Sequence, residues 1–513
     1  MNAILNPVRA EAALRAAGAF RPFPPAADRA AWDDIRAALE PDETAAWLAR
    51  AEQAAAAPAD DRSALAALAV AVCLFDESRF LGPLFNCAWA ICEESAWWAW
   101  PGPADPAAPQ LDGRAAMTAL ALAELDALLG AALPPALAAR LRAEVNRRVL
   151  APFMSRHDFG WMFSASHEAA VCVAGAVGAA LHLEPDPARL AEVVARGLWA
   201  LDGGPQQFAP CGWARGLGAW ALLAHLLAAR TGGRVDPLAD SAGLARLPLL
   251  ARLSPGVYAG CPPADGPAAP LLSWLAQRFD QPDLARLAPE QRAAPASGLP
   301  WALRGLLWRP GAASAVPPEL PARDWDQRFA WMTARFAPSD PGALALAVLG
   351  GCGAAVCFGG DLLIADVPPP LAGGQPAQPD AAAVPLERQF NPTFDFMSLE
   401  LKNAYPPEAG LLSLRRVAAL HRTPPHGWVE LADGVLFDDA PRTLTTALVA
   451  RGGAALAPGV AVLDGRRGAL RVEYDPEQVS ARLEPGAGLS RVEFAFREPR
   501  RSGAIRLKIE PVL

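Results

Sequence analysis

The stretch LELKNAYPPEAGLLSLRRVAAL, residues 399–420, is the most informative part of the chain for its fold. Apolar and polar residues alternate on both sides of the turn PPEAG, which is the pattern of two strands joined by a turn. The same alternation recurs downstream, and DGRRG at 464–468 is typical of a hairpin turn. Upstream, residues 342–366 form short apolar runs broken by glycine, and 367–385 predict an irregular loop. Many short antiparallel strands predict a β-sandwich.

The chain before about residue 310 has a different texture. Apolar residues recur at intervals of three and four in runs such as RAAWDDIRAALE and GRAAMTALALAELDALLGAAL, which predicts helices. Further helices are expected at 168–182, 187–202, 213–231 and 269–279. Several of these segments are apolar on more than one side, which favours a layered multi-helix assembly, such as a toroid of helical hairpins, over one small bundle. We predict a multidomain α+β protein with a helical domain at 1–315 and a sandwich at 320–513.

Composition narrows the class of function. The 513 residues include 46 Lys and Arg against 54 Asp and Glu, a net charge of −8. This acidic balance argues against nucleic acid as a partner, because such proteins gather cations to neutralise phosphate. The N-terminal segment lacks the continuous apolar core of a signal peptide, and no run has convincing membrane character. We therefore expect a cytoplasmic protein without a membrane partner.

Cysteine usage gives no sign of a metal or cofactor. Most of the eight cysteines lie in apolar runs such as AVCLF, which predicts buried reduced thiols. Cys352 and Cys357 are five residues apart, but no second Cys/His pair completes a zinc site. We predict no metal site and no cofactor.

Three motifs resemble the heparinase II/III-like family of polysaccharide lyases. They are NCAWAICEESAWW at 86–98, NRRVLAPFMSRHDFGWM at 146–162 and the AYPPEAGLLSLRR segment of 399–420, in that order along the chain. The resemblance implies an (α/α) toroid followed by an antiparallel β-sandwich. It also implies β-elimination at a uronic acid, with a neutralised substrate carboxylate, a base at the C5 proton and an acid at the leaving oxygen.

The residues that carry this chemistry in the family are replaced here. The family's Asn-rich stretch corresponds to 164–170, which reads SASHEAA, and its Tyr segment corresponds to 206–216, with Gly212 at the Tyr position. The family's His-rich loop would follow residue 351, yet no histidine lies between His225 and His421. The resemblance therefore implies a degraded or rewired catalytic set.

Two adjacent residues are candidates for catalysis. His167 could serve as the base, because an imidazole titrates near neutral pH, and Glu168 accompanies it. The alternative is structural: a glutamate in a first helical turn can satisfy the helix dipole, and His167 can be a capping or surface residue. Neighbouring residues do not share a helix face, so the two need not act together.

Four further residues are candidates for substrate binding. Trp161 and Trp213 could stack on sugar rings or pack in the core, and Arg215 could grip a carboxylate or simply be solvated. His157 lies in the SRHDFGWM turn, where Asp158 is expected to cap. Arg415 and Arg416 are interpreted as structural, on opposite faces of one strand.

Three functions remain open from the sequence. The first is a heparinase II/III-like protein that binds acidic poly- or oligosaccharide with lost or rewired catalysis. The second is an active lyase in which His167 is the base and Arg215 holds the carboxylate. The third is a non-catalytic scaffold. The sequence leaves the oligomeric state undetermined.

Overall fold

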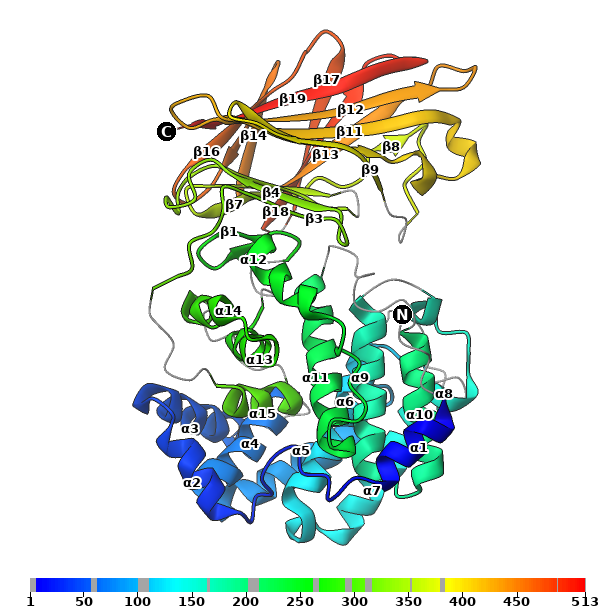
Figure 1. Ribbon diagram of the computed structural model, residues 1–513, viewed down its shortest axis with the longest axis vertical. Coiled ribbons are helices and arrows are strands. Elements are labelled where there is room, and N and C mark those ends of the chain that lie inside the picture. The colour runs from blue at the N-terminus through cyan, green and yellow to red at the C-terminus, as the bar shows by residue number, and fades with distance from the viewer. Residues whose placement is uncertain are drawn as a thin grey trace. The chain divides into compact units, whose positions relative to one another are not determined.

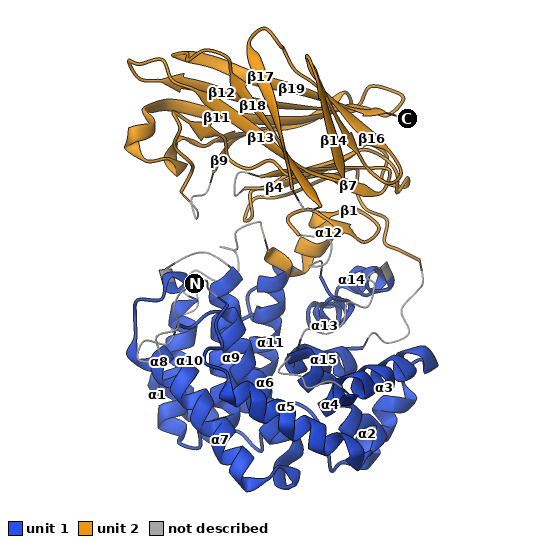
Figure 2. Ribbon diagram, turned by 180° about the vertical axis from the view of Figure 1, so that it is seen from behind, with its two compact units in different colours: residues 1–205, 215–244, 267–315 blue, residues 206–214, 245–266, 316–513 orange. Residues whose placement is uncertain are grey.

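A computed structural model describes residues 6–56, 62–99, 110–163, 167–201, 212–261, 267–290, 298–309, 316–350, 353–378, 383–486 and 488–512. The chain divides into two compact units (Figure 2). The helical unit comprises residues 1–205, 215–244 and 267–315, and the β unit comprises 206–214, 245–266 and 316–513. The two units interleave along the chain, and the predicted domain limits, 1–315 and 320–513, stay a prediction.

The helical unit is layered by burial (Figure 1). Its most buried helices form an inner set: α4 (Arg62–Phe75), α6 (Gly113–Leu129), α9 (His167–Leu183), α11 (Trp213–Thr231) and α15 (Leu299–Leu307). The other helices are more exposed: α1 (Pro7–Arg15), α2 (Arg29–Ala37), α3 (Pro41–Ala56), α5 (Leu81–Glu93), α7 (Pro135–Val145), α8 (Ala151–Ser155), α10 (Pro187–Ala200), α13 (Ala269–Phe279) and α14 (Pro282–Leu287). Of these, α2, α3 and α5 pack on α4, α7 packs on α6, α10 on α9 and α13 on α15, whereas α1 packs on α10 and α14 on α13. Consecutive helices such as α3 and α4, or α9 and α10, pack as hairpins. The predicted helices at 168–182, 187–202, 213–231 and 269–279 are confirmed.

Helix α6 is the core of this unit. The stretch Gly113–Ala132 is long and apolar enough to cross a membrane by length and composition alone, but 72% of its most apolar window is buried inside the protein. Two acidic residues interrupt it, and each is paired: Glu124 with Arg304, and Asp126 with Arg142. Its apolar character on all sides is that of a helix surrounded by other helices.

The β unit contains two large antiparallel sheets. An eight-stranded sheet has the order β14-β15-β16-β19-β12-β11-β10-β9, and the second sheet runs β17-β18-β13-β7-β6-β5-β4-β3, with β8 paired to β13. Their facing side chains share one apolar core, as the predicted sandwich requires. The strands are β3 (Arg323–Asp326), β4 (Trp331–Arg335), β5 (Ala345–Val348), β6 (Ala354–Phe358), β7 (Asp361–Asp366), β8 (Leu371–Ala372), β9 (Val384–Phe390), β10 (Phe394–Glu400), β11 (Leu411–His421), β12 (Trp428–Phe437), β13 (Leu444–Arg451), β14 (Gly453–Ala457), β15 (Val460–Asp464), β16 (Ala469–Glu473), β17 (Val479–Pro485), β18 (Leu489–Phe496) and β19 (Ser502–Val512). The same unit holds α12 (Leu247–Ala251), β1 (Arg252–Ser254) and β2 (Val257–Tyr258).

Three local predictions about the sandwich have clear outcomes. DGRRG joins β15 to β16, so the predicted hairpin is confirmed. The predicted irregular loop at 367–385 is wrong at two places. Leu371–Ala372 forms β8, because it pairs with β13, and β9 begins at Val384, because it pairs with β10.

Arg416 ties the sandwich together from inside. Its side chain is fully buried, and its Nε and Nη2 donate to the two oxygens of Asp433 at 2.8 and 2.9 Å. Its remaining donors reach the carbonyls of Val367 and Pro368, while Arg415 is exposed. The structural interpretation is confirmed for Arg416, and the two arginines lie on opposite faces of β11 as predicted, whereas the role of Arg415 stays a prediction.

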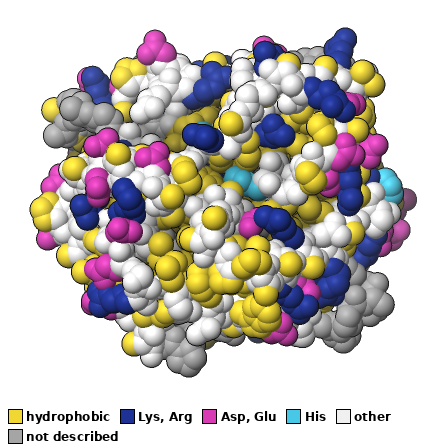
Figure 3. Space-filling model, turned by 90° about the horizontal axis from the view of Figure 1, so that it is seen from below, with side chains coloured by type: hydrophobic (Ala, Val, Ile, Leu, Met, Phe, Trp, Pro, Cys, Tyr) yellow, Lys and Arg dark blue, Asp and Glu magenta, His cyan; other side chains and the backbone are white. Residues whose placement is uncertain are grey.

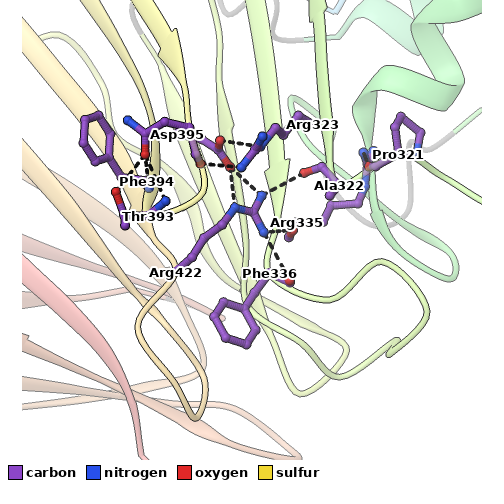
Figure 4. Close-up of polar contacts among 10 residues, drawn as sticks. Pro321, Ala322, Arg323, Arg335, Phe336, Thr393, Phe394, Asp395 and Arg422 are labelled. Atoms are coloured by element: carbon purple, nitrogen blue, oxygen red, sulfur yellow. Dashed lines mark hydrogen bonds and ion pairs between the residues drawn. The ribbon is translucent and has the colours of Figure 1, made fainter.

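A second buried acid joins the two sheets at one end of the sandwich (Figure 4). Asp395 on β10 is fully buried and lies 2.6 Å from Arg323 Nε on β3. Arg422 also donates to Asp395, and its Nη1 reaches the carbonyls of Arg335 and Phe336 at 3.0 and 3.2 Å. One carboxylate therefore organises two cations and the ends of strands from both sheets.

Candidate functional site

The inner helices α6 and α9 run parallel, so both begin at the same end of the helical unit. Gly113, the first residue of α6, lies against Glu168 near the start of α9. Further along, Gly175 approaches the backbone of Ala116 so closely that a Cβ there would lie 2.4 Å from its carbonyl carbon. The N-terminal ends of both helices, with their positive dipoles, are therefore neighbours.

Two carboxylates at this end are used to cap α6. Asp112 is its N-cap, and its Oδ1 accepts from Ala115 N at 2.8 Å while its Oδ2 accepts from Ala99 N at 2.7 Å. Glu168 Oε1 accepts from Gly113 N at 2.5 Å. Four N–H groups at a helix start lack intrahelical partners, and these two side chains satisfy two of them. Glu168 therefore has a structural partner on another helix.

His167 and Arg215 remain at the same end. His167 is the first residue of α9 and is half-buried, whereas Arg215, in the first turn of α11, is exposed. Burial and the charges of Glu168 and Asp112 raise the pKa of the Cys172 thiol, and Arg215 opposes them. Arg215, at the start of α11, therefore lies within electrostatic reach of Cys172, which is in the second turn of α9.

Trp161 is held inside the helical unit. It is 8% exposed, and its indole Nε1 donates to Leu111 O at 2.7 Å. The rings of Phe153 and Phe159 lie nearly parallel to it, with centroids 6.4 and 5.8 Å away. The indole thus fixes the chain just before α6 and has little surface for a sugar ring.

Trp213 is packed in the β unit. It is 1% exposed, its Nε1 donates to Ala259 O at 2.9 Å, and it contacts the rings of Tyr258 and Trp331. No face of the indole is open to a ligand in this conformation. We therefore leave both tryptophans out of the proposed binding site.

His157 lies on the outer side of the helical unit. Its Nδ1 is 3.3 Å from Arg196 Nη1 on α10, and the neighbouring Arg156 forms a two-pronged ion pair with Asp158 at 2.9 Å. This pair lowers the pKa of Asp158. Within the described residues, no contact joins His157 to Arg215, so these two predicted binding residues are not brought together.

The described cysteines are buried, as predicted. Burial raises the pKa of Cys73 and Cys357 to about 12, which makes them poor nucleophiles and poor metal ligands. Across the described ranges, no group of three or more His, Cys, Asp or Glu side chains is arranged to hold a metal ion. The buried set is Cys73, Cys87, Cys92, Cys172, Cys261 and Cys357, whereas Cys211 and Cys352 lie outside the described residues.

Solved structures similar to this chain show its fold. A crystal structure of heparinase III matches with a TM-score of 0.57 over 89% of this chain and 78% of that chain, at 11% identity. The chain has the heparinase III fold. A heparinase III gene product (TM-score 0.48, 11% identity, 88% and 77% of the chains) and a heparan sulfate lyase mutant from Pedobacter heparinus (0.47, 10%, 98% and 87%) are also similar. No family model matches the sequence, and no curated protein does.

The heparinase III fold confirms the predicted architecture, a helical toroid followed by a sandwich. At 11% identity it establishes the fold alone. Of the stretches 164–170 and 206–216, where the Asn-rich and Tyr segments were expected to be lost, residues 164–166 and 206–211 lie outside the described residues. Gly212, at the expected Tyr position, is described and has a φ of 80°. Asp112 was not singled out from the sequence, although an Asp just before an apolar periodic run is a recognisable N-cap signal.

Proposed function

We propose that this chain binds an acidic, uronic-acid-containing saccharide, with Arg215 holding a carboxylate. The observation that carries the proposal is an exposed Arg215 beside the N-terminal ends of inner helices in a heparinase III fold. Helix N-termini and a guanidinium both favour anions, and an arginine fork fits a carboxylate with two hydrogen bonds.

The side chains described at this end support binding more than elimination. β-Elimination needs a base, an acid and a group that neutralises the carboxylate. Arg215 can neutralise, but Glu168 and Asp112 are occupied by the start of α6. Tyr258, whose ring lies 6.3 Å from that of Trp213, is only 3% exposed and has little surface for a substrate.

An active lyase is the second candidate, and one observation favours it. His167 lies at the same end of the helical unit as Arg215, on the first turn of its helix. In that reading His167 takes the C5 proton and Arg215 stabilises the carboxylate onto which the carbanion charge spreads. The C4–O bond then breaks, and a proton from solvent reaches the leaving oxygen.

A lyase assay separates the two candidates. Purified protein is incubated with a panel of uronic-acid polysaccharides and oligosaccharides over a range of pH, with and without divalent metal. The ultraviolet absorbance of the unsaturated uronate product is followed. Saccharide binding without product supports the proposal, whereas product that disappears in His167→Ala replaces it with the lyase. If folded protein neither binds a saccharide nor forms product, the non-catalytic scaffold is the remaining function.

A further inference from the structure

A buried ion pair lies in the helical unit, toward the C-terminal ends of the same inner helices. Arg304 on α15 and Glu124 on α6 are both 0% exposed, and Arg304 Nη1 donates to Glu124 Oε1. His182 on α9 joins them, with its Nε2 4.0 Å from the same oxygen and its side chain 1% exposed. Burying such groups is costly unless their hydrogen bonds are made.

The hydrogen bonds of this cluster are incomplete. Arg304 Nε and Nη2, Glu124 Oε2 and His182 Nε2 are buried and have no partner among the described residues. Buried polar atoms almost always have partners, so four in one place need an explanation. An unseen group that accepts from arginine would supply it.

The two free nitrogens of Arg304 define the shape of that group. Nε and Nη2 form one edge of the guanidinium, the edge with which Arg416 grips both oxygens of Asp433 and Arg156 grips both oxygens of Asp158. In Arg304 neither nitrogen of this edge has a hydrogen-bond partner among the described residues. Its matched ligand is a planar group with two oxygens, such as a carboxylate.

The chain between α1 and α2, residues 16–26, closes this site and is called the strap below. Phe20 and Phe23 lie against the His182 ring with centroids 4.7 and 5.7 Å away, and the Phe23 ring lies 5.9 Å from Arg304 Cζ. His225 Nε2 lies 3.4 Å from Pro22 O. The strap thus covers the cluster with aromatic rings.

The face of the molecule seen in Figure 3 carries no patch of one charge. Figure 3 views the molecule from below Figure 1, where the dark blue α1 and the chain after it lie. Charged side chains of both signs are interspersed there with apolar ones around a shallow hollow. The candidate site is therefore the buried edge of Arg304 beneath the strap, and a small ligand is the appropriate probe.

We propose that the Nε–Nη2 edge of Arg304 is an internal binding site for a small carboxylate, enclosed by the strap. The site is separate from Arg215 and does not depend on the proposed saccharide binding. A ligand of formate size satisfies both free nitrogens, as a side-chain carboxylate does for Arg416.

Because the charges at this buried site must balance, binding of a carboxylate should be accompanied by uptake of a proton. The ionisable groups around the site are Glu124, His182, His225 and Arg304, with Arg230 over the Phe20 ring of the strap. A bound carboxylate adds a second negative charge to an ion pair that is already neutral. A proton on Glu124, whose pKa burial raises against the opposing effect of Arg304, restores neutrality. Formate should therefore bind more tightly as pH falls.

The test uses formate as the probe. The unfolding midpoint of the full chain is measured against sodium formate at constant ionic strength, made up with sodium chloride, for wild type, Arg304→Lys and Arg142→Lys. Arg304→Lys keeps a cation beside Glu124 but removes the fork. Arg142→Lys is the matched control, because that fork already grips Asp126 on α6 at 2.9 and 3.3 Å.

The expected result is a saturable rise in the midpoint for wild type and for Arg142→Lys, stronger at lower pH. In Arg304→Lys the apparent affinity should fall about tenfold or more, the usual effect of losing a bidentate pair. No formate effect in wild type, or an equal effect in Arg304→Lys, overturns the proposal.

A second measurement does not depend on a variant that folds. A crystal structure of wild type grown in formate should show planar three-atom density on Nε and Nη2 of Arg304. Water molecules alone on that edge, or protein atoms packed against it, would refute the site.

Discussion

Glu168 and Asp112 determine how the central helix α6 begins. Both carboxylates accept backbone N–H groups at its first turn, and Glu168 does so from a position 55 residues away in the chain. The sequence suggested that Glu168 satisfies a helix dipole. It could not indicate which helix, because the contact depends on α6 and α9 lying parallel and close.

This role predicts how Glu168 variants behave. Glu168→Ala should lower the free energy of unfolding by about 1 kcal/mol, the typical value of a lost cap, as measured by urea denaturation. Glu168→Gln keeps an acceptor oxygen and should lose less. A normal stability for both variants, together with loss of a measured lyase activity, would instead favour the catalytic role.

Two buried histidines predict acid sensitivity. Burial lowers the pKa of His182 to about 3 and of His225 to about 4, from 6.5 in the unfolded chain. Between pH 6.5 and 4 the unfolded chain binds these protons and the folded chain does not, so stability falls as pH drops through this window. His225→Gln should remove about 1.4 kcal/mol per pH unit from that dependence. Parallel pH profiles of wild type and variant, measured by urea denaturation, would contradict the burial of His225.

The close packing of α6 on α9 is a property of whole helices rather than of single residues. The helices themselves were predictable from their three- and four-residue periodicity, and α11 and α13 have the expected limits. The sequence did not predict which helices lie inside the unit. Helices α4, α6 and α9 are apolar on most sides, so their patterns indicate no preferred buried face. The small residues that set the distance between two helices can be interpreted only when the facing helix is known.

Gly175 provides the test of this packing. Gly175→Ala should cost about 1–3 kcal/mol by overpacking, because its Cβ would meet the backbone of Ala116. Gly305→Ala is the matched control: it lies within α15, has open space around it, and should be neutral or stabilising by up to about 1 kcal/mol. Equal effects of the two changes on the unfolding free energy would contradict the close approach of α6 and α9.

Trp213 illustrates a tryptophan that packs between elements of the β unit. Trp213→Phe should cost about 1 kcal/mol, because it removes the hydrogen bond to Ala259 O while keeping an aromatic ring. Since the indole is buried, saccharide affinity of the folded variant should be unchanged. A calorimetric titration in which affinity drops while the unfolding free energy is retained would return Trp213 to the binding site.

At the scale of the whole molecule, the order of helices before strands was sufficient to predict the architecture. The heparinase III fold is retained at 11% identity because it depends on which positions are apolar and where turns fall, not on particular residues. The candidate site was less predictable, because its side chains come from α6, α9 and α11. Only their assembly separates Arg215, which is exposed, from Trp161 and Trp213, which are buried.

The most direct test is a calorimetric titration of the uronic-acid oligosaccharides of the lyase assay, one at a time, into wild type, Arg215→Lys and Arg215→Ala. We expect saturable binding to wild type, with Arg215→Ala weakened about tenfold or more and Arg215→Lys intermediate, because lysine keeps the charge but loses the fork. Equal affinity in all three proteins, or no binding to any of them, would contradict saccharide recognition by Arg215.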